Sequence, residues 1–230
     1  MPRQEIGLHG GISHFVWNDP RANIETLQWE LAQGVRALHQ VGIQPTSFSF
    51  PRDREAFHEL LPRQGIRCYR GRTPTLPFRL GSTLAGSALR ALDQLGALAP
   101  PLVSPRETLP GLWNIPSSAF LYPLGVWRSR LVPLRTRVAS FQKGIDAAVA
   151  HGGIFHFCLH PANLTESAHG FDMLEQMLEG LVRARDAGDI EVLTITQVVE
   201  RMERPTKRED SLRVENFHAA GVLDRAHATV

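Results

Sequence analysis

The feature that most constrains the fold of this chain is a repeated alternation between short apolar runs and longer segments with helical spacing. Between residues 22 and 41, apolar side chains recur every three or four positions, which predicts an amphipathic helix. A β-rich run at 46–50 follows, and Pro51 ends it because proline cannot donate to a strand ladder. Strands separated by helices form parallel βα units, so the pattern predicts an α/β fold. In such folds the carboxyl ends of the strands gather the chemistry.

The same alternation continues to residue 203 and gives the expected elements. Helices are predicted at 22–41, 54–64, 84–97, 136–151, 170–187 and 196–203, and strands at 46–50, 66–69, 112–116, 154–159 and 190–194. The stretch 72–135 is rich in proline and glycine, and its signal is the weakest. We expect one domain over residues 1–203, followed by a polar, flexible tail at 204–230, where no periodicity is found.

Charge, hydropathy and cysteine content exclude several classes of protein. The 230 residues carry a formal net charge of +2, and no segment interleaves basic with aromatic residues as nucleic-acid binders do. The first residues lack the apolar core of a signal peptide, and the longest apolar runs are shorter than a bilayer span. Both cysteines lie in apolar runs, which is typical of buried reduced thiols. We therefore expect a cytoplasmic protein with no nucleic-acid partner and no membrane span.

Two histidines on one short turn are the first candidates for chemistry. His9 and His14 are five residues apart, and Gly10, Gly11 and Ser13 lie between them. Flexible glycines let both imidazoles converge on one divalent cation, although a pair of surface histidines beside a glycine turn is the simpler interpretation. The Ser13 hydroxyl can hold a ring or cap the helix that follows. A metal site normally needs a third protein ligand, which must come from another part of the chain.

Other candidate residues follow predicted strands. Arg52 can hold a carboxylate or a substrate oxygen with its planar fork, or it can simply begin a helix that Asp53 caps. His160 ends the strongest predicted strand and can act as a general acid near neutral pH. His156 lies on the same face of that strand and is expected to be a core residue. Trp113 can stack on a flat sugar face or belong to the core, and the sequence leaves both open.

Taken together, these stretches resemble the polysaccharide deacetylase family, the NodB-homology hydrolases. The matching segments, in order along the chain, are 5–14, 47–52, 65–71, 112–117 and 155–164. Their order and spacing are similar to one branch of that family over roughly residues 4–200. The resemblance implies a distorted (β/α) barrel and a metal-dependent hydrolase that removes N-acetyl groups from a carbohydrate substrate.

The family's chemistry uses one zinc or similar divalent ion, held by an Asp and two His, with an open position that polarises an acetamide carbonyl and acidifies a water. Carried over to this sequence, the resemblance makes His9 and His14 the metal ligands. It implies that Arg52 orients the catalytic carboxylate, that Trp113 lines the substrate pocket and that His160 is the general acid.

The resemblance is incomplete at one point. The family's first motif, an aspartate pair at the end of the first strand, has no counterpart before His9, and the two histidines are five residues apart where the family has four. Asp19 and Asp53 are the nearest acids, and nothing in their sequence context makes either a replacement. We therefore expect a barrel that is incomplete at the N-terminus, the C-terminal portion of a deacetylase, whose open edge allows association with another chain.

Two other functions stay open. The chain can be a catalytically inactive remnant that binds carbohydrate or pairs with another chain. It can also be a related amide or imide hydrolase on the same scaffold, since the variable region 72–135 shapes the pocket and a fold does not fix the substrate.

Overall fold

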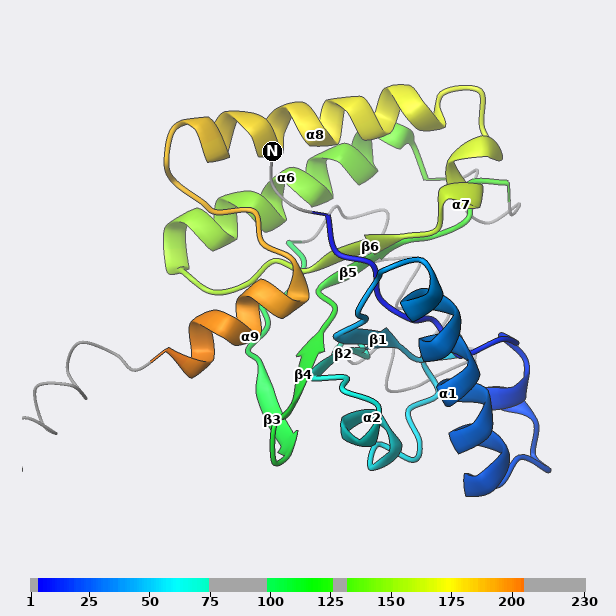
Figure 1. The fold of residues 1–230 in the computed structure, drawn as a ribbon. Helices are drawn as coiled ribbons and strands as arrows, with labels where there is room; N and C mark the ends of the chain where they lie inside the picture. The colour runs from blue at the N-terminus through cyan, green and yellow to red at the C-terminus, as the bar shows by residue number, and fades with distance from the viewer. Residues whose placement is uncertain (1–3, 75–98, 126–131, 205–230) are drawn as a thin grey trace, which may run out of the picture.

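The computed structural model describes residues 4–74, 99–125 and 132–204 (Figure 1). Within these ranges the fold is mixed α/β, as the alternation predicts. The elements, in chain order, are the 3₁₀ turn η1 (Val16–Asn18), α1 (Ile24–Gln40), β1 (Ser47–Ser49), the 3₁₀ turn η2 (Pro51–Asp53), α2 (Leu60–Arg63), β2 (Cys68–Gly71), β3 (Arg106–Leu109), β4 (Leu112–Pro116), β5 (Ala119–Leu121), α6 (Leu134–His151), β6 (Phe157–Leu159), α7 (Pro161–Thr165), α8 (Gly170–Asp186) and α9 (Ile195–Glu203).

The described strands form two sheets. A four-stranded sheet has the order β1-β2-β4-β3, in which β1, β2 and β4 run parallel and β3 pairs antiparallel with β4. Leu8 extends this sheet by one bridge to Phe48 in β1, in the parallel sense. The second sheet consists of the parallel pair β5 and β6. Within residues 4–74, 99–125 and 132–204 these strands do not close into a barrel.

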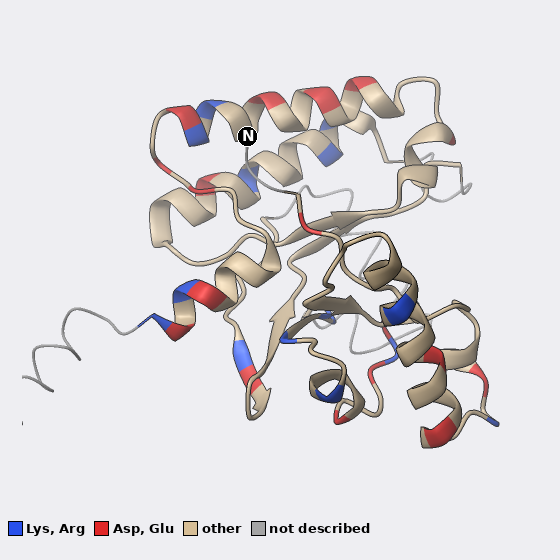
Figure 2. Ribbon diagram, viewed as in Figure 1, with Lys and Arg blue, Asp and Glu red and all other residues tan. Residues whose placement is uncertain are grey.

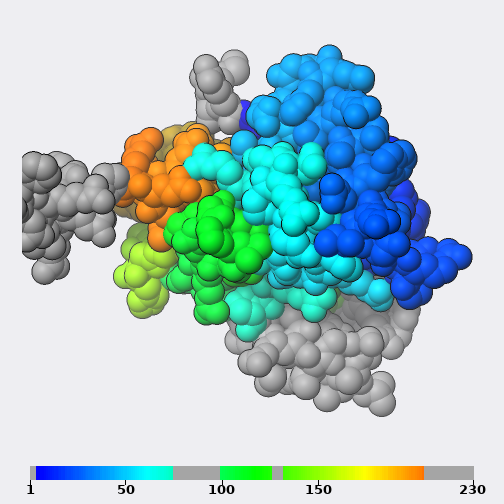
Figure 3. Space-filling view, turned by 60° about the horizontal axis from the view of Figure 1, so that its bottom comes forward, coloured from blue at the N-terminus to red at the C-terminus, as the bar shows by residue number. Residues whose placement is uncertain are grey.

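Helices cover the sheets in separate layers, each with its own apolar cluster. One cluster lies between α1, α2 and the first strands, with Leu31, Phe48 and Leu61 at its centre. The paired helices α6 and α8 lie side by side over β5 and β6, where Ile145 and Met173 are buried (Figure 1). In a view from below, α1, the α2 segment and the β3–β4 hairpin share one face (Figure 3).

A third and smaller cluster joins α9 to the four-stranded sheet. It contains Cys68 in β2, Ile115 in β4, and Val198 and Val199 in α9. Helix α9 begins with a capping box, because the Thr194 side chain accepts from the backbone of residue 197 while the residue 197 side chain accepts from the backbone of Thr194. This local signal fixes where α9 starts, and the cluster fixes which part of the sheet it covers.

Most predicted elements are confirmed, with shifted ends. Four predicted helices are formed: α1, α6, α8 and α9 correspond to the predictions at 22–41, 136–151, 170–187 and 196–203. Four predicted strands are formed as well: β1, β2, β4 and β6 correspond to the predictions at 46–50, 66–69, 112–116 and 154–159. The predicted helix at 84–97 and nearly all of the tail at 204–230 lie outside the described residues.

Two predicted elements are wrong in extent or type. Only Leu60–Arg63 of the helix at 54–64 is formed, because Phe57 has a positive φ of 52° that interrupts a helix. The strand at 190–194 is absent: residues 191–193 are an exposed connection that leads into the Thr194 cap. Strands β3 and β5 and helix α7 were not predicted, since each has only three to five residues.

The longer helices α1, α6, α8 and α9 are amphipathic and carry both signs of charge. Acidic residues are spread along α8 and its basic residues lie in the last turn, while α9 carries both signs in its second half (Figure 2). None of the helices in the described part of the chain is both long and apolar enough to cross a bilayer.

Candidate functional site

The histidine turn is held against α1 by two glycines. Gly10 has a φ of +81°, a conformation that favours glycine, and it lets the chain reverse directly after His9. Any β-carbon at Gly11 would collide with the backbone carbonyl of Glu30, and one at Gly34 would lie 2.9 Å from the Gly11 α-carbon. The glycines therefore allow a close backbone contact between turn and helix, which fixes the position of the turn.

A buried carboxylate adds a second attachment. Glu30 in α1 is only 3% exposed, and its side chain accepts a hydrogen bond from the backbone N–H of Ser13. The Ser13 hydroxyl in turn accepts from the backbone N–H of Phe15. A buried carboxylate is stable only when its oxygens are paired, so this contact ties the second half of the turn to α1.

Three imidazoles meet beside this turn, although they come from distant parts of the chain. The ring centroids of His9 and His14 are 4.8 Å apart, and those of His9 and His160 are 6.2 Å apart. His9 follows the bridge at Leu8, and His160 directly follows β6. The structure thus brings both predicted metal ligands and the predicted general acid to one place, at the carboxyl ends of parallel strands.

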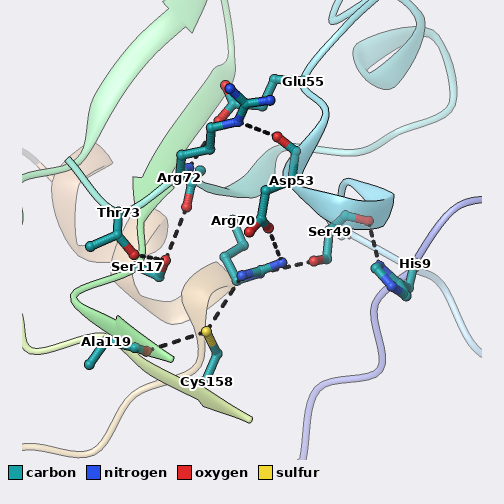
Figure 4. A network of polar contacts seen from close by, with 11 residues as sticks. His9, Ser49, Asp53, Glu55, Arg70, Arg72, Thr73, Ser117, Ala119 and Cys158 are labelled. Atoms are coloured by element: carbon teal, nitrogen blue, oxygen red, sulfur yellow. Dashed lines mark hydrogen bonds and ion pairs between the residues drawn. The ribbon is translucent and has the colours of Figure 1, made fainter. Parts of the chain in front are cut away.

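His9 has a defined orientation because its ring is hydrogen-bonded to the main chain. Its Nδ1 donates to the backbone carbonyl of Ser49 at 2.9 Å (Figure 4). That bond selects the tautomer in which Nε2 carries the free lone pair. Metal-binding histidines commonly use one ring nitrogen in this way while the other binds the ion.

His14 is biased toward the neutral form that can bind a metal. Loss of hydration lowers its pKa, and the nearby charges of His9 and Arg52 lower it further. Because only a neutral imidazole has a lone pair for a cation, the lowered pKa keeps His14 available as a ligand at neutral pH.

Arg70, near the end of β2, links the strands of this edge (Figure 4). Its guanidinium donates to the Ser49 hydroxyl at 3.0 Å, to the Asp53 carboxylate at 2.5 Å and to the Cys158 sulfur at 3.5 Å. The side chain is only 14% exposed, so these bonds form in a region with little competing water. Arg70 thereby connects β1, η2 and β6. Its partner Ser49 is also the residue whose backbone carbonyl orients His9.

The same network continues across the ends of β2 and β4. Arg72 donates its backbone N–H to the Glu55 carboxylate at 2.9 Å and its side chain to the Asp53 carbonyl. Thr73 and Ser117 share a buried hydrogen bond of 2.9 Å. The carboxyl edge is therefore lined by polar groups that are fixed by one another.

The loop that carries Asp53 is strained. Arg52 and Asp53 have consecutive positive φ values of 54° and 53°, which cost roughly 1–2 kcal/mol per residue outside glycine. Such strain persists where surrounding contacts hold it, and it is concentrated at functional sites. Here the bonds from Arg70 and Arg72 hold Asp53 in place.

The structure places the other predicted residues as follows. Arg52 is exposed, and its guanidinium lies 5.9 Å from the centre of the Phe15 ring. The arginine that pairs with a carboxylate at this edge is Arg70. Trp113 packs beside Cys68 against α9, at the opposite end of the strands. None of the ring contacts among described residues joins it to the histidines, so this position favours its core alternative.

Two further residues discussed in the sequence analysis, His156 and Asp19, have defined partners away from the histidine turn. His156 is bonded through Nδ1 to the Pro116 carbonyl at 3.0 Å, and burial lowers its pKa, as suits a core histidine. Asp19 pairs with Arg21 at the surface, and the hydrogen bonds from that arginine lower its pKa to about 2.

The two histidines fit a metal centre, but the aspartate that the resemblance implies has no counterpart beside them. Within the described ranges, no group of three or more histidine, cysteine, aspartate or glutamate side chains is arranged to hold a metal ion. His9 and His14 are thus the two members of the donor set implied by the resemblance that the described residues bring together.

The sequence analysis identified neither Arg70 as a residue of this edge nor Asp53 as its partner. Arg70 lies in Cys68–Gly71, a strand followed by a polar segment, and an arginine at the carboxyl end of a strand is the signal that could have identified it. The partner of that arginine comes from a strained loop 17 residues earlier, and no local pattern indicates such a pairing.

The chain matches no protein-family model, and no curated protein is significantly similar to it in sequence. The deacetylase resemblance therefore stays a prediction, and a function has to be argued from the geometry of the site.

Proposed function

We propose that this protein is a metal-dependent hydrolase that removes N-acetyl groups from a carbohydrate, on a scaffold related to the distorted barrel of the polysaccharide deacetylases. The observation that carries the proposal is the convergence of His9, His14 and His160, with His9 oriented by the Ser49 carbonyl. Parallel strands present their carboxyl ends to substrates in open α/β folds, and these three imidazoles lie at that edge.

His9 and His14 are the proposed protein ligands of a divalent ion, zinc being the ion that imidazoles commonly bind. A third ligand comes from outside the described residues. When bound, such an ion polarises the acetamide carbonyl and lowers the pKa of a water molecule.

The chain's own residues have separate roles in hydrolysis. Water adds to the acetamide carbon, the C–N bond breaks, and acetate and a free amine are formed. His160 gives a proton to the leaving amine nitrogen. Asp53, held by Arg70, is the proposed acceptor of the water proton. Arg52, exposed at the rim, binds a substrate oxygen with its planar fork.

The central test is metal content together with acetate release. The wild-type chain and the double variant His9→Ala/His14→Ala are dialysed against zinc, and bound metal is measured by mass spectrometry. We expect about one zinc per wild-type chain and none above background in the double variant, because both proposed ligands are removed. The matched control is His39→Ala/His151→Ala, which removes two exposed helix-end histidines.

Acetate release from N-acetylated oligosaccharides is measured on the same samples. A chelator and the His9→Ala/His14→Ala change should both abolish it, while the control pair should leave it unchanged. Equal zinc content in all three proteins would contradict the proposal. Zinc binding without acetate release would instead favour a carbohydrate-binding role or hydrolysis of a different amide or imide.

A further inference from the structure

A groove lies between the C-terminal halves of α6 and α8, the two helices that pack side by side (Figure 1). Its volume is about 430 Å³, which is within the range of clefts that bind small molecules. The lining residues all come from 142–149 and 180–189, so the groove is separate from the histidine site at the strand ends. The proposed hydrolysis makes no use of it.

Short side chains on α8 form one wall of the groove. Gly180, Ala184 and Ala187 are spaced for one side of a helix, and they leave room between α8 and α6. On the α6 side, Ile145 is buried and Val149 is 44% exposed. The apolar part of the lining is therefore aliphatic, and it suits a ligand with a small aliphatic group.

Charged groups of both signs border this aliphatic surface. Asp146 on α6 and Asp189, just after α8, supply two carboxylates, and Arg183 on α8 supplies a guanidinium. The Gln142 side chain donates from Nε2 to the Asp146 carboxylate at 2.9 Å and so orients it. Gly188, with a φ of +81°, lets the chain turn directly after α8, which brings Asp189 to the groove.

We propose that this groove binds a free α-amino acid with an aliphatic side chain. The ammonium group of the ligand pairs with the carboxylates of Asp146 and Asp189, and its carboxylate pairs with the guanidinium of Arg183. Its side chain packs on the aliphatic lining. Arg183 also faces Glu179 at 3.9 Å, a long and exposed contact that engages one of its nitrogens.

An amino acid fits this lining better than related small molecules do. An aliphatic amine leaves the guanidinium unused, and an aliphatic acid meets two carboxylates of its own sign. A residue within a peptide chain carries neither charge. The groove therefore distinguishes free amino acids by the two charged groups that they carry on one carbon.

The test is isothermal titration of the full chain with three ligands of related skeleton, without added metal and with a chelator present. L-Leucine carries both charges, isoamylamine lacks the carboxylate, and 4-methylpentanoate lacks the ammonium. We expect a Kd of about 1 mM for leucine and values at least about fivefold higher for the other two, because each of these loses a charge-assisted contact. Added salt should weaken leucine binding, since the charges are exposed.

Variants assign the contacts one by one. Arg183→Gln should weaken leucine binding by about five- to tenfold and change isoamylamine binding by less than about twofold. Asp146→Asn/Asp189→Asn should weaken the binding of leucine and isoamylamine, but not that of 4-methylpentanoate. Ala187→Leu fills the groove and should abolish the binding of all three ligands. Because Ala187 is exposed, this variant should unfold in urea like the wild type.

The matched controls change exposed residues of the same two helices outside the groove: Ala139→Leu, Glu175→Gln and Arg185→Gln. Three results would overturn the inference: no binding of leucine up to about 20 mM, equal affinity for leucine and isoamylamine, or undiminished leucine binding by Ala187→Leu. None of them depends on acetate release, so the inference and the proposed function can fail separately.

Discussion

The two ends of the same three parallel strands, β1, β2 and β4, are built in opposite ways. At the amino ends, Cys68 and Trp113 face α9. Thr46, just before β1, shares a hydrogen bond of 2.9 Å with Thr196 of α9. At the carboxyl ends, Arg70 pairs with Asp53 in a network of polar side chains that stays partly open to solvent. Among residues 4–74, 99–125 and 132–204, a helix covers the first end, whereas polar side chains line the second.

This difference separates stability from chemistry. An end covered by apolar contacts lowers the free energy of the folded state, and its residues cannot reach a substrate. An open end gains less from burial, but its side chains are fixed by hydrogen bonds and stay accessible. Substitutions at the two ends should therefore change different quantities, and four experiments test that separation.

The largest effect is expected at the open end, on activity. His160→Ala should lower kcat for acetate release by roughly 10²- to 10⁴-fold, because the leaving amine loses its proton donor. The free energy of unfolding should change by less than about 0.5 kcal/mol, since His160 is exposed. Denaturant titration and steady-state kinetics on one preparation give both numbers.

The control for this variant lies four residues earlier on the same segment. His156→Ala removes a half-buried group bonded to the Pro116 carbonyl, so about 1–3 kcal/mol of stability should be lost. If His160→Ala destabilises the protein as much as His156→Ala does, the separation between the two ends is wrong.

The second effect is expected at the covered end, on stability. Trp113→Ala should lower the free energy of unfolding by about 3 kcal/mol, because it leaves a cavity between β4 and α9. Acetate release per folded molecule should stay at the wild-type level. Urea unfolding with activity measured below the transition checks both, and a selective loss of substrate affinity would restore Trp113 as a pocket residue.

The third experiment acts on the contact that positions the histidine turn. Gly11→Ala places a β-carbon against the Glu30 carbonyl and should cost about 1–3 kcal/mol while weakening zinc binding. Gly34→Ala strains the same contact from the helix side. The double variant should therefore lose less than the sum of the two single losses. Full additivity in unfolding measurements would show that the turn and α1 do not form one unit.

The smallest effect is a pH dependence at the covered end. Burial raises the pKa of the Cys68 thiol from its ordinary 9.0 to about 12. Between those values the unfolded chain releases a proton that the folded protein keeps, so stability falls as pH rises, by up to about 1.4 kcal/mol per pH unit. Urea titrations at pH 8, 9 and 10 should show a steeper fall for wild type than for Cys68→Ala. Equal slopes would mean that the thiol is not buried as the structure has it.

Local patterns in the sequence were sufficient for the regular elements. The spacing of Leu27, Leu31 and Val35 predicts α1 because a helix returns to one face every three or four residues. Very short elements such as β5 carry too few residues for a period, and their pairing partners are remote in sequence. In the failed strand at 190–194, residues 191–193 are exposed, and none of the described strands pairs with them.

For the site, the sequence alone indicated His9, Arg52 and His160 by their positions after predicted strands, and His14 by its place on the same turn as His9. The tertiary structure decided which of them meet, because the bonds from Arg70 to Ser49, Asp53 and Cys158 join segments that no local rule connects. It also placed Trp113 at the covered end. A chain fixes its helices through near neighbours, but a site is fixed through contacts between distant segments, and these exist only after folding.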